Sequence, residues 1–399
     1  MNSRTLALSR SALAALPAVA AVAWLGSASD GRAQTQRTLK FREQQIATDF
    51  GVGYAVTTGD VNGDTRTDIV AISGTDLVWF EAPGFEKRVI LSGATPKDNV
   101  CLAVEDIDRD GKLDVALGAS WQPSNTSGGG TLHWARQTPA GTPWELHSIS
   151  EEPTLHRIRW ADVDGDGTRE LVVAPLHGRG TKGPEWEGQG ARLLIFRRPA
   201  KPAAEAWTSE VADDTLHILH NILPANMDDD RQEELLTASR EGVHLLDRKG
   251  PNGWSRTLIG EGAPGEIKMG RVGGRRMMAT IEPWHGQSVV VYAEGQGPWS
   301  RTVIESGIGG GHALGWADFD GDGDDELAVG WRDAKPVKPG VAVYDVDRNG
   351  AMQSKAMVDE GGMATEDLVV ADLNGDKQPD IVASGRATRN VKIYWNETR

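Results

Sequence analysis

Short apolar runs recur along the chain, and each follows an acidic turn at a fixed spacing. The run Ile69-Val70-Ala71 directly follows Asp68, and a matching Ile-Val-Ala run directly follows Asp380. Short β-branched runs bounded by Gly and Asp are typical of strands joined by tight turns. The alternation therefore predicts an all-β fold built from one repeated unit.

The acidic turns share one pattern, with acidic or amide side chains at relative positions one, three, five and nine. Six copies are present: Asp60, Asn62, Asp64 and Asp68; Asp106, Asp108, Asp110 and Asp114; Asp162, Asp164, Asp166 and Glu170; Asn226, Asp228, Asp230 and Glu234; Asp318, Asp320, Asp322 and Glu326; and Asp372, Asn374, Asp376 and Asp380. A hard divalent cation takes about six to eight oxygen ligands, and alternate residues of a tight loop can supply them. The pattern predicts a calcium ion in up to six loops.

These loops differ from an EF-hand, which opens with the same Asp-x-Asp-x-Asp-Gly pattern. The last ligand of an EF-hand stands at about position twelve, between two helices. Here the last ligand stands at position nine and a strand is expected to follow. Because each ion would lie identically in its own repeat, a structural role is favoured over a catalytic one.

A seventh unit without a metal loop lies between the fourth and fifth loops. Residues 268–281 keep the hydrophobic frame, with Arg271 where the first acidic residue would stand. Seven units of about 50 residues predict a seven-bladed β-propeller with four strands in each blade. We expect blades at approximately residues 50–92, 98–150, 154–213, 217–260, 264–305, 310–360 and 364–395, and strands of the third blade near residues 156–161, 170–174, 191–196 and 207–212.

The outermost strand of the last blade is expected to come from the other end of the propeller segment. Six units contain an outer strand like Arg301-Thr-Val-Ile304, but the last unit ends near Trp395 without one. Phe41–Ile46 has the required pattern and belongs to no other blade. Residues 39–47 are therefore predicted to complete the last blade and close the ring.

Composition agrees with this fold and restricts the partners. The chain has 48 Gly and 14 Trp against 6 Phe and 4 Tyr, which suits many short strands and tight turns. Asp and Glu outnumber Lys and Arg by 57 to 42, and the net charge of −15 argues against a nucleic-acid partner. Cys101 is the single cysteine, so no internal disulfide can form.

The N-terminal 33 residues are expected to be a signal peptide. Arg4 and Arg10 precede an apolar run at residues 11–25, and small residues follow it. An uncleaved membrane anchor is the alternative, but the run is short and contains Pro17. We therefore expect residues 34–399 to form the propeller, secreted or periplasmic, with no membrane contact after cleavage.

The acidic loops resemble the FG-GAP or VCBS repeat propellers, whose best-known member is the integrin alpha headpiece. A narrower likeness rests on the segments 156–160, 175–179, 219–221, 282–285 and 385–390. These segments are similar to secreted proteins related to the propeller part of aldos-2-ulose dehydratase, which eliminates water from keto-sugars such as anhydrofructose. That enzyme also carries cupin domains, for which these residues leave no segment, so the resemblance implies only the chemistry of the propeller.

In this blade type, the residue six positions before the first metal ligand lies at the upper mouth of the central channel. That position is occupied by Tyr54, Val100, His156, His220, His312 and Glu366. The loops after the second strands overhang the same mouth and add His177, Arg179, Trp186, Trp284, His285, Arg332 and Arg386. Five of the nine histidines are thus expected to converge at one end of the channel.

These residue types suit carbohydrate chemistry. We expect catalysis from His156, His220, His312, His177, His285 and Tyr54, with His156 ranked first as the base, and substrate binding from Arg179, Trp186, Trp284, Arg332, Glu366 and Arg386. Alternatively, His156, His220 and His312 could hold a transition metal such as Zn²⁺ that polarises a carbonyl.

Two functions remain open from the sequence. The first is a lyase or dehydratase that performs β-elimination on a keto-sugar or uronic-acid saccharide. The second is a non-catalytic propeller that binds a glycan or a protein. The histidine ring favours the first, because a binding module has no need of several titratable groups at one channel mouth.

Overall fold

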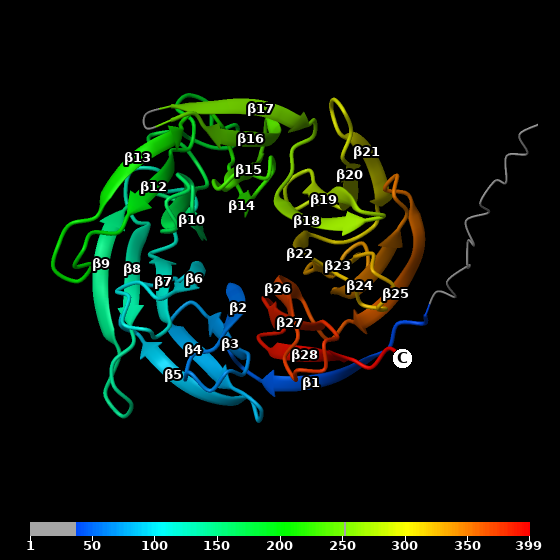
Figure 1. The fold of residues 1–399 in the computed structure, drawn as a ribbon, viewed down its shortest axis with the longest axis horizontal. Helices are drawn as coiled ribbons and strands as arrows, with labels where there is room; N and C mark the ends of the chain where they lie inside the picture. The colour runs from blue at the N-terminus through cyan, green and yellow to red at the C-terminus, as the bar shows by residue number, and fades with distance from the viewer. Residues whose placement is uncertain (1–36, 251–252) are drawn as a thin grey trace, which may run out of the picture. The chain divides into compact units, whose positions relative to one another are not determined.

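The computed structural model describes residues 37–250 and 253–399, so the predicted signal peptide lies outside the described residues. The described residues form 28 strands and no helix, arranged as seven four-stranded antiparallel sheets around a centre (Figure 1). The predicted all-β, seven-bladed propeller is confirmed. No helix in the described part of the chain is long and apolar enough to cross a membrane.

Each blade begins at the centre with an innermost strand, and the second strand pairs with it antiparallel. The innermost strands are β2 (Ala55–Gly59), β6 (Cys101–Glu105), β10 (Leu155–Ala161), β14 (Asn221–Ala225), β18 (Glu266–Val272), β22 (Gly311–Ala317) and β26 (Thr365–Ala371). The second strands are β3 (Asp68–Ile72), β7 (Asp114–Ala119), β11 (Glu170–Pro175), β15 (Glu234–Ser239), β19 (Arg275–Glu282), β23 (Glu326–Trp331) and β27 (Asp380–Gly385).

The third and fourth strands complete the blades toward the outside. The third strands are β4 (Asp76–Glu81), β8 (Thr131–Arg136), β12 (Leu193–Arg197), β16 (Gly242–Arg248), β20 (Ser288–Ala293), β24 (Gly340–Val346) and β28 (Val391–Asn396). The fourth strands are β5 (Glu86–Ser92), β9 (Glu145–Glu151), β13 (Thr208–Asp213), β17 (Trp254–Gly260), β21 (Ser300–Glu305), β25 (Met352–Glu360) and β1 (Phe41–Ala47).

The second strands explain why the apolar runs of the sequence exist. In β7, β11, β15, β23 and β27 every residue is buried, because neighbouring blades pack on both faces of a central strand. The outer strands are exposed along much of their length, as in β5. The strands expected for the third blade agree with β10 to β13 to within two residues at each end.

The outer strand of the last blade comes from the start of the described chain. β1 pairs antiparallel with β28, and Phe41 stands opposite Asn396 in the register (Figure 1). The Trp395 indole donates a hydrogen bond of 2.8 Å to the Gln44 side chain across this pair. One sheet therefore contains residues from the two ends of the described chain.

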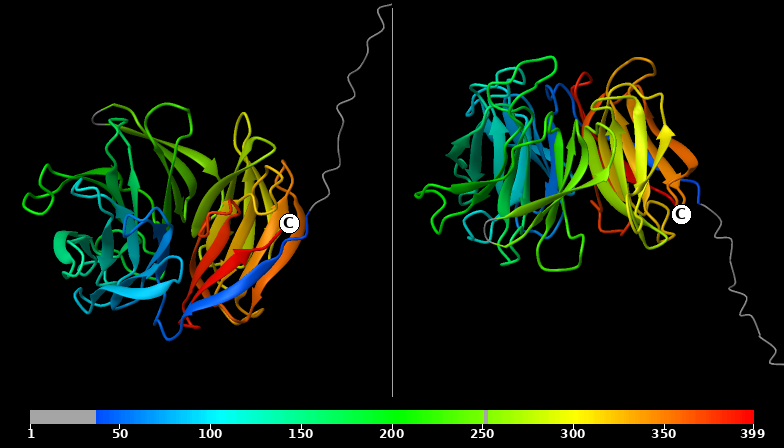
Figure 2. Two further views of the ribbon diagram at one scale, coloured as in Figure 1. Left: turned by 60° about the horizontal axis from the view of Figure 1, so that its bottom comes forward. Right: turned by 90° about the horizontal axis from the view of Figure 1, so that it is seen from above.

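Loops join the strands at two opposite ends of the blades (Figure 2). At one end, the acidic loops connect innermost strands to second strands, as the loop at residues 162–169 connects β10 to β11. At the other end, the innermost strands begin and the second strands finish. Side chains at the starts of the innermost strands and in the loops after the second strands therefore share one end of the channel.

Candidate functional site

A cavity of about 330 Å³ lies at the end of the channel where the innermost strands begin. Its size is within the range of small-molecule sites. It is lined by Tyr54, Val100, Trp121, Pro123, Ser124, His156, Arg157, Leu176, His177, Trp186, His220, Trp284, His285, His312, Arg332, Glu366 and Arg386. We call this space the histidine cavity.

Three histidines in the cavity lie close enough to share a metal ion. His220, His285 and His312 offer ring nitrogens that all lie within 4.8 Å of one another. The ring centroids of His220 and His285 are 4.5 Å apart, and those of His285 and His312 are 4.6 Å apart. Three imidazoles at one point are a donor set that suits Zn²⁺ and its neighbours.

Hydrogen bonds fix the tautomers of two members of this trio. His220 donates its Nδ1–H to the carbonyl of Gly265, and His312 donates its Nδ1–H to the carbonyl of Glu366. Each Nε2 is therefore left without a proton, which is the arrangement typical of a metal-binding imidazole. The Nε2 of His285 lies 2.6 Å from the Nε2 of His220, and its Nδ1 accepts a hydrogen bond from Arg332.

The histidines of the cavity are held in their neutral form. Burial lowers the pKa of His156, His220 and His312 well below the usual range, and neighbouring cations and histidines lower it further. Burial, followed by the charge of Arg332, lowers the pKa of His285 to about 2. Neutral imidazoles can bind a metal or accept a proton.

His156 differs from His220 and His312 because a guanidinium group faces its Nε2. Its Nδ1–H donates to the carbonyl of His220 at 2.9 Å, and its Nε2 accepts a hydrogen bond from Arg157 at 2.9 Å. The sequence suggested His156, His220 and His312 as a metal trio. The trio within coordinating distance contains His285 instead, and the Nε2 of His156 faces the Arg157 guanidinium.

His177 and Tyr54 are the other titratable residues expected to act in catalysis, and both line the cavity. The His177 ring stacks on Trp186 with 3.8 Å between the ring centroids, and its buried Nδ1 has no hydrogen-bond partner. Burial alone lowers the pKa of His177 to about 4. Burial, followed by the charge of Asp98, raises the pKa of Tyr54, so its hydroxyl keeps its proton at neutral pH.

Two arginines enter the cavity from loops that follow second strands, and one carboxylate holds both. Glu366 is buried and accepts hydrogen bonds from Arg332 at 2.6 Å and from Arg386 at 2.8 Å. The Arg386 guanidinium also lies over the Tyr54 ring, 5.7 Å from its centroid. The bonds of Glu366 fix the position of the two guanidinium groups, and its contact with substrate stays a prediction.

The structure brings together eleven of the twelve residues expected to act in catalysis or to bind substrate, and the exception is Arg179. Arg179 is bound by the buried carboxylate of Glu152 at 2.6 Å, and that carboxylate also binds Arg192. Glu152 lies between β9 and β10 and does not line the cavity, so its bond holds the Arg179 guanidinium outside the group of lining residues.

Sequence reasoning missed Arg157 as a member of the site. Arg157 is 8% exposed and lines the histidine cavity beside His156. The motif His156-Arg-Ile-Arg-Trp160 could have indicated it. Charged residues are rarely buried, so arginines on an innermost propeller strand are expected to point into the central channel.

Four of the six acidic loops gather at least three carboxylates with oxygens within 4.8 Å of one another. These groups are Asp106, Asp108 and Asp114; Asp162, Asp164 and Glu170; Asp228, Asp230 and Glu234; and Asp318, Asp320, Asp322 and Glu326. Burial and neighbouring carboxylates raise the pKa of Glu326 to about 8. Calcium in these loops stays a prediction, which their clustered oxygen atoms fit.

Comparison with known proteins matches parts of the chain to two family models and to one curated protein. Residues 129–295 match the family model described as the aldos-2-ulose dehydratase beta-propeller domain, and residues 60–117 match that of the FG-GAP-like repeat. The chain is also 27% identical over 299 residues to aldos-2-ulose dehydratase of Phanerodontia chrysosporium. This match covers 65% of the chain and 33% of the relative, so it spans about a third of that protein's length.

Proposed function

We propose that this protein is a secreted carbon–oxygen lyase that removes water from a keto-sugar by β-elimination in the histidine cavity. The observation that carries the proposal is the convergence of histidines, Tyr54 and two arginines on one cavity. Elimination needs a base, an acid and a positive charge at the carbonyl oxygen, and these residues can supply all three. The match to a dehydratase propeller supports a keto-sugar as the substrate class.

The trio of His220, His285 and His312 fits a zinc-like ion, because two of its imidazoles present an unprotonated Nε2. When bound, such an ion would polarise the carbonyl group of the sugar. Binding would also require the Nε2 of His285 to lose its proton and its Nδ1 to turn from acceptor to donor. The Nη2 of Arg332 would then lose its contact to that Nδ1 and could donate to substrate oxygens, while Nη1 keeps its hydrogen bond to Glu366.

His177 is the base that the hydrogen bonds favour. The Nε2 of His156 faces the Arg157 guanidinium, and a proton added there would be repelled by that charge. His177 has no cation within hydrogen-bonding distance among the described residues, and its ring is held in place by Trp186. We therefore assign removal of the proton next to the carbonyl to His177.

The remaining steps use Tyr54, Arg332 and Arg386, which line the same cavity. The electron pair of the broken C–H bond forms the new C=C bond as the β-hydroxyl group leaves. Tyr54 keeps its proton at neutral pH and can give it to the departing oxygen, which leaves as water. Arg332 and Arg386, fixed by Glu366, stabilise the negative charge that develops on the carbonyl oxygen.

The test is a search for the conjugated product. The purified protein is incubated with an aldos-2-ulose, with anhydrofructose and with acidic polysaccharides, and the ultraviolet absorbance of a new conjugated double bond is followed. An increase in this absorbance with a keto-sugar supports the dehydratase. An increase with a uronic-acid polysaccharide would show that the protein performs β-elimination on that substrate instead. Saturable glycan binding without any new absorbance would favour the non-catalytic propeller instead.

A further inference from the structure

A second cavity, of about 450 Å³, lies on the other side of Arg157 in the channel. It is lined by later residues of the innermost strands, including Thr57 of β2, Arg159 of β10, Lys268 of β18 and Asp367 of β26. Arg157 lines both cavities, so it separates this space from the histidine cavity. We call it the basal cavity.

Two guanidinium groups in the basal cavity have no carboxylate partner among the described residues. Arg157 donates to the Nε2 and the carbonyl of His156, and Arg159 donates to the carbonyl of Ile158 and to the Asn221 side chain. Burial, followed by the charge of Arg157, lowers the pKa of Arg159. Arg157 is buried and Arg159 is half-buried, and charges in such places are normally paired, so a bound anion would be stabilised between them.

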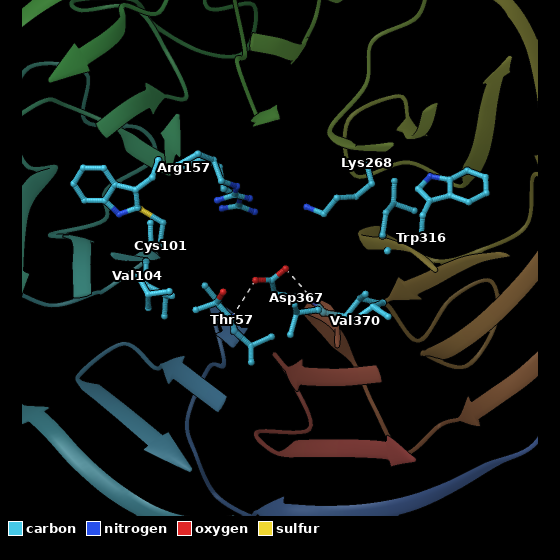
Figure 3. Close-up of a pocket in the computed structure, with 18 of the residues that line it drawn as sticks. Thr57, Cys101, Val104, Arg157, Lys268, Trp316, Asp367 and Val370 are labelled. Atoms are coloured by element: carbon cyan, nitrogen blue, oxygen red, sulfur yellow. Dashed lines mark hydrogen bonds between the residues drawn. The ribbon is translucent and has the colours of Figure 1, made fainter. Parts of the chain in front are cut away.

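Lys268 adds a third positive charge from the opposite wall. Figure 3 shows the Arg157 and Lys268 side chains extending toward the same open space, with Asp367 at its edge. The Lys268 ammonium lies 3.5 Å from Glu266, whose carboxylate also accepts a hydrogen bond from Asn221. The Lys268 ammonium therefore lies near Glu266 and also lines the cavity, where it can bind a further anion.

Asp367 faces these cations without touching them. Its two carboxylate oxygens accept backbone hydrogen bonds of 3.0 Å from Val56 and Leu368, drawn as dashed lines in Figure 3. Among the described residues, no salt bridge joins it to Arg157 or Lys268. The carboxylate is thus fixed at the edge of an open space, where its remaining lone pairs can accept hydrogen bonds from hydroxyl groups.

The charge balance selects the kind of anion. Arg157, Arg159, Arg169 and Lys268 contribute four positive charges, and Glu266, Asp367 and Glu105, the partner of Arg169, contribute three negative ones, so these residues leave one positive charge. A single negative charge would neutralise it. A dianion such as phosphate would exceed that balance and be repelled by Asp367.

We propose that the basal cavity binds a small hydroxycarboxylate, such as the acid form of a sugar. Its carboxylate lies between Arg157, Arg159 and Lys268, and its hydroxyl groups donate to Asp367. Guanidinium groups match carboxylate geometry, and Trp160 and Trp316 add apolar walls that suit the carbon chain. This site is separate from the histidine cavity and does not depend on the proposed elimination.

Calorimetry with sodium gluconate tests the proposal on the mature protein at constant ionic strength. We expect saturable binding with a Kd below about 1 mM. Acetate, which lacks hydroxyl groups, and inorganic phosphate should each bind at least about 10-fold more weakly. Absence of saturable heat with gluconate, or tighter binding of phosphate than of gluconate, would overturn the assignment.

Variants locate the bound acid. Lys268→Gln and Arg159→Gln should each weaken gluconate binding at least about 10-fold. Asp367→Asn should weaken the binding of gluconate without weakening the binding of acetate. Lys87→Gln, which removes the same charge from the outer strand β5, is the matched control and should change nothing.

A variant of the other cavity distinguishes the two sites. Arg386→Gln removes a cation from the histidine cavity and should leave gluconate binding unchanged. Loss of binding in Arg386→Gln with full binding in Lys268→Gln would place the acid in the histidine cavity and overturn the basal site. Because binding is measured without turnover, failure of the dehydratase proposal would not alter this result.

Discussion

The five histidines of the cavity differ in what their ring nitrogens contact. His156, His220 and His312 each donate from Nδ1 to a backbone carbonyl, but the Nε2 of His156 faces Arg157 and that of His220 faces His285. His177 has a stacked ring and an unpartnered Nδ1. The catalytic or metal-binding role of each histidine therefore cannot be assigned from residue type alone, because the groups that contact its ring nitrogens differ.

The assignment of the base gives a direct comparison of two variants. With a substrate found in the absorbance search, His177→Gln should lower kcat at least about 100-fold, the usual contribution of a general base. His156→Gln should lower kcat less, because Arg157 occupies the nitrogen that would take the proton. A larger loss in His156→Gln than in His177→Gln would return the role of base to His156, as the sequence suggested.

His177 should also make the fold sensitive to acid. Its pKa is about 4 in the folded protein and higher in the unfolded chain, so the unfolded state binds more protons between about pH 6.5 and pH 4. The stability contributed by the neutral ring is complete above that interval and is lost as the pH falls through it. The slope from this one group is at most about 1.4 kcal/mol per pH unit.

Urea unfolding at pH 7 and at pH 4.5 checks this effect. The wild-type protein should lose more free energy of unfolding between the two pH values than His177→Gln does. Equal losses in the two proteins would mean that the His177 environment does not depress its pKa in solution.

At the scale of single elements, β1 is the strand whose removal has the clearest consequence. It supplies the outer strand of the last blade and covers β28, whose residues are all buried. Buried contacts include Lys392, which pairs with Glu43 of β1 and with Asp359 of the neighbouring blade. Without β1, the edge of β28 and the ammonium of Lys392 would face solvent.

Deletion of residues 38–47 should therefore prevent stable folding of the last blade. We expect a lower melting temperature or insoluble protein, because unpaired strand edges promote aggregation. A chain that lacks only residues 1–33 keeps β1 and is the matched control. A soluble deletion protein with the melting temperature of the control would show that the strand is dispensable.

At the scale of the whole molecule, the acidic loops repeat around the ring and concentrate negative charge at one end of the blades. In four loops, carboxylate oxygens from at least three residues lie within 4.8 Å of one another, close enough to bind one cation. Burial and mutual repulsion raise the pKa of Asp114 and Glu170 to about 7. A divalent cation in each loop would relieve this repulsion.

Removal of calcium should loosen the propeller as a whole. We expect excess EGTA to lower the melting temperature by at least about 5 °C and added calcium chloride to restore it, because an ion that binds only the folded state stabilises it. Elemental analysis of the untreated protein should find several calcium ions per chain. An unchanged melting temperature together with no bound calcium would contradict the metal assignment of the loops.

The sequence predicted the ring more fully than it predicted the site. The propeller can be predicted because each repeat contains a recognisable acidic turn followed by an apolar second strand. Tyr54, His156, His220 and His312 each stand six positions before such a turn, so their positions could be inferred from this spacing. The hydrogen-bond acceptors of the three histidine Nδ1 atoms could not be inferred, because they come from neighbouring blades. Arg157 lies between two cavities, and Arg179 forms a salt bridge with Glu152. Both arrangements depend on packing between segments, which a local sequence pattern does not show.

The pairing of β1 with β28 also sets an order in time during synthesis. The strands β2 to β25 form six blades from consecutive segments, and each of these sheets can pair as soon as its own residues are free to fold, at the ribosome or after export. β1 is made before all of them, yet its contact from Gln44 to Trp395 spans 351 residues. The first strand therefore waits without its partner until nearly the whole propeller has been translated, and the last blade is the final part of the molecule to assemble.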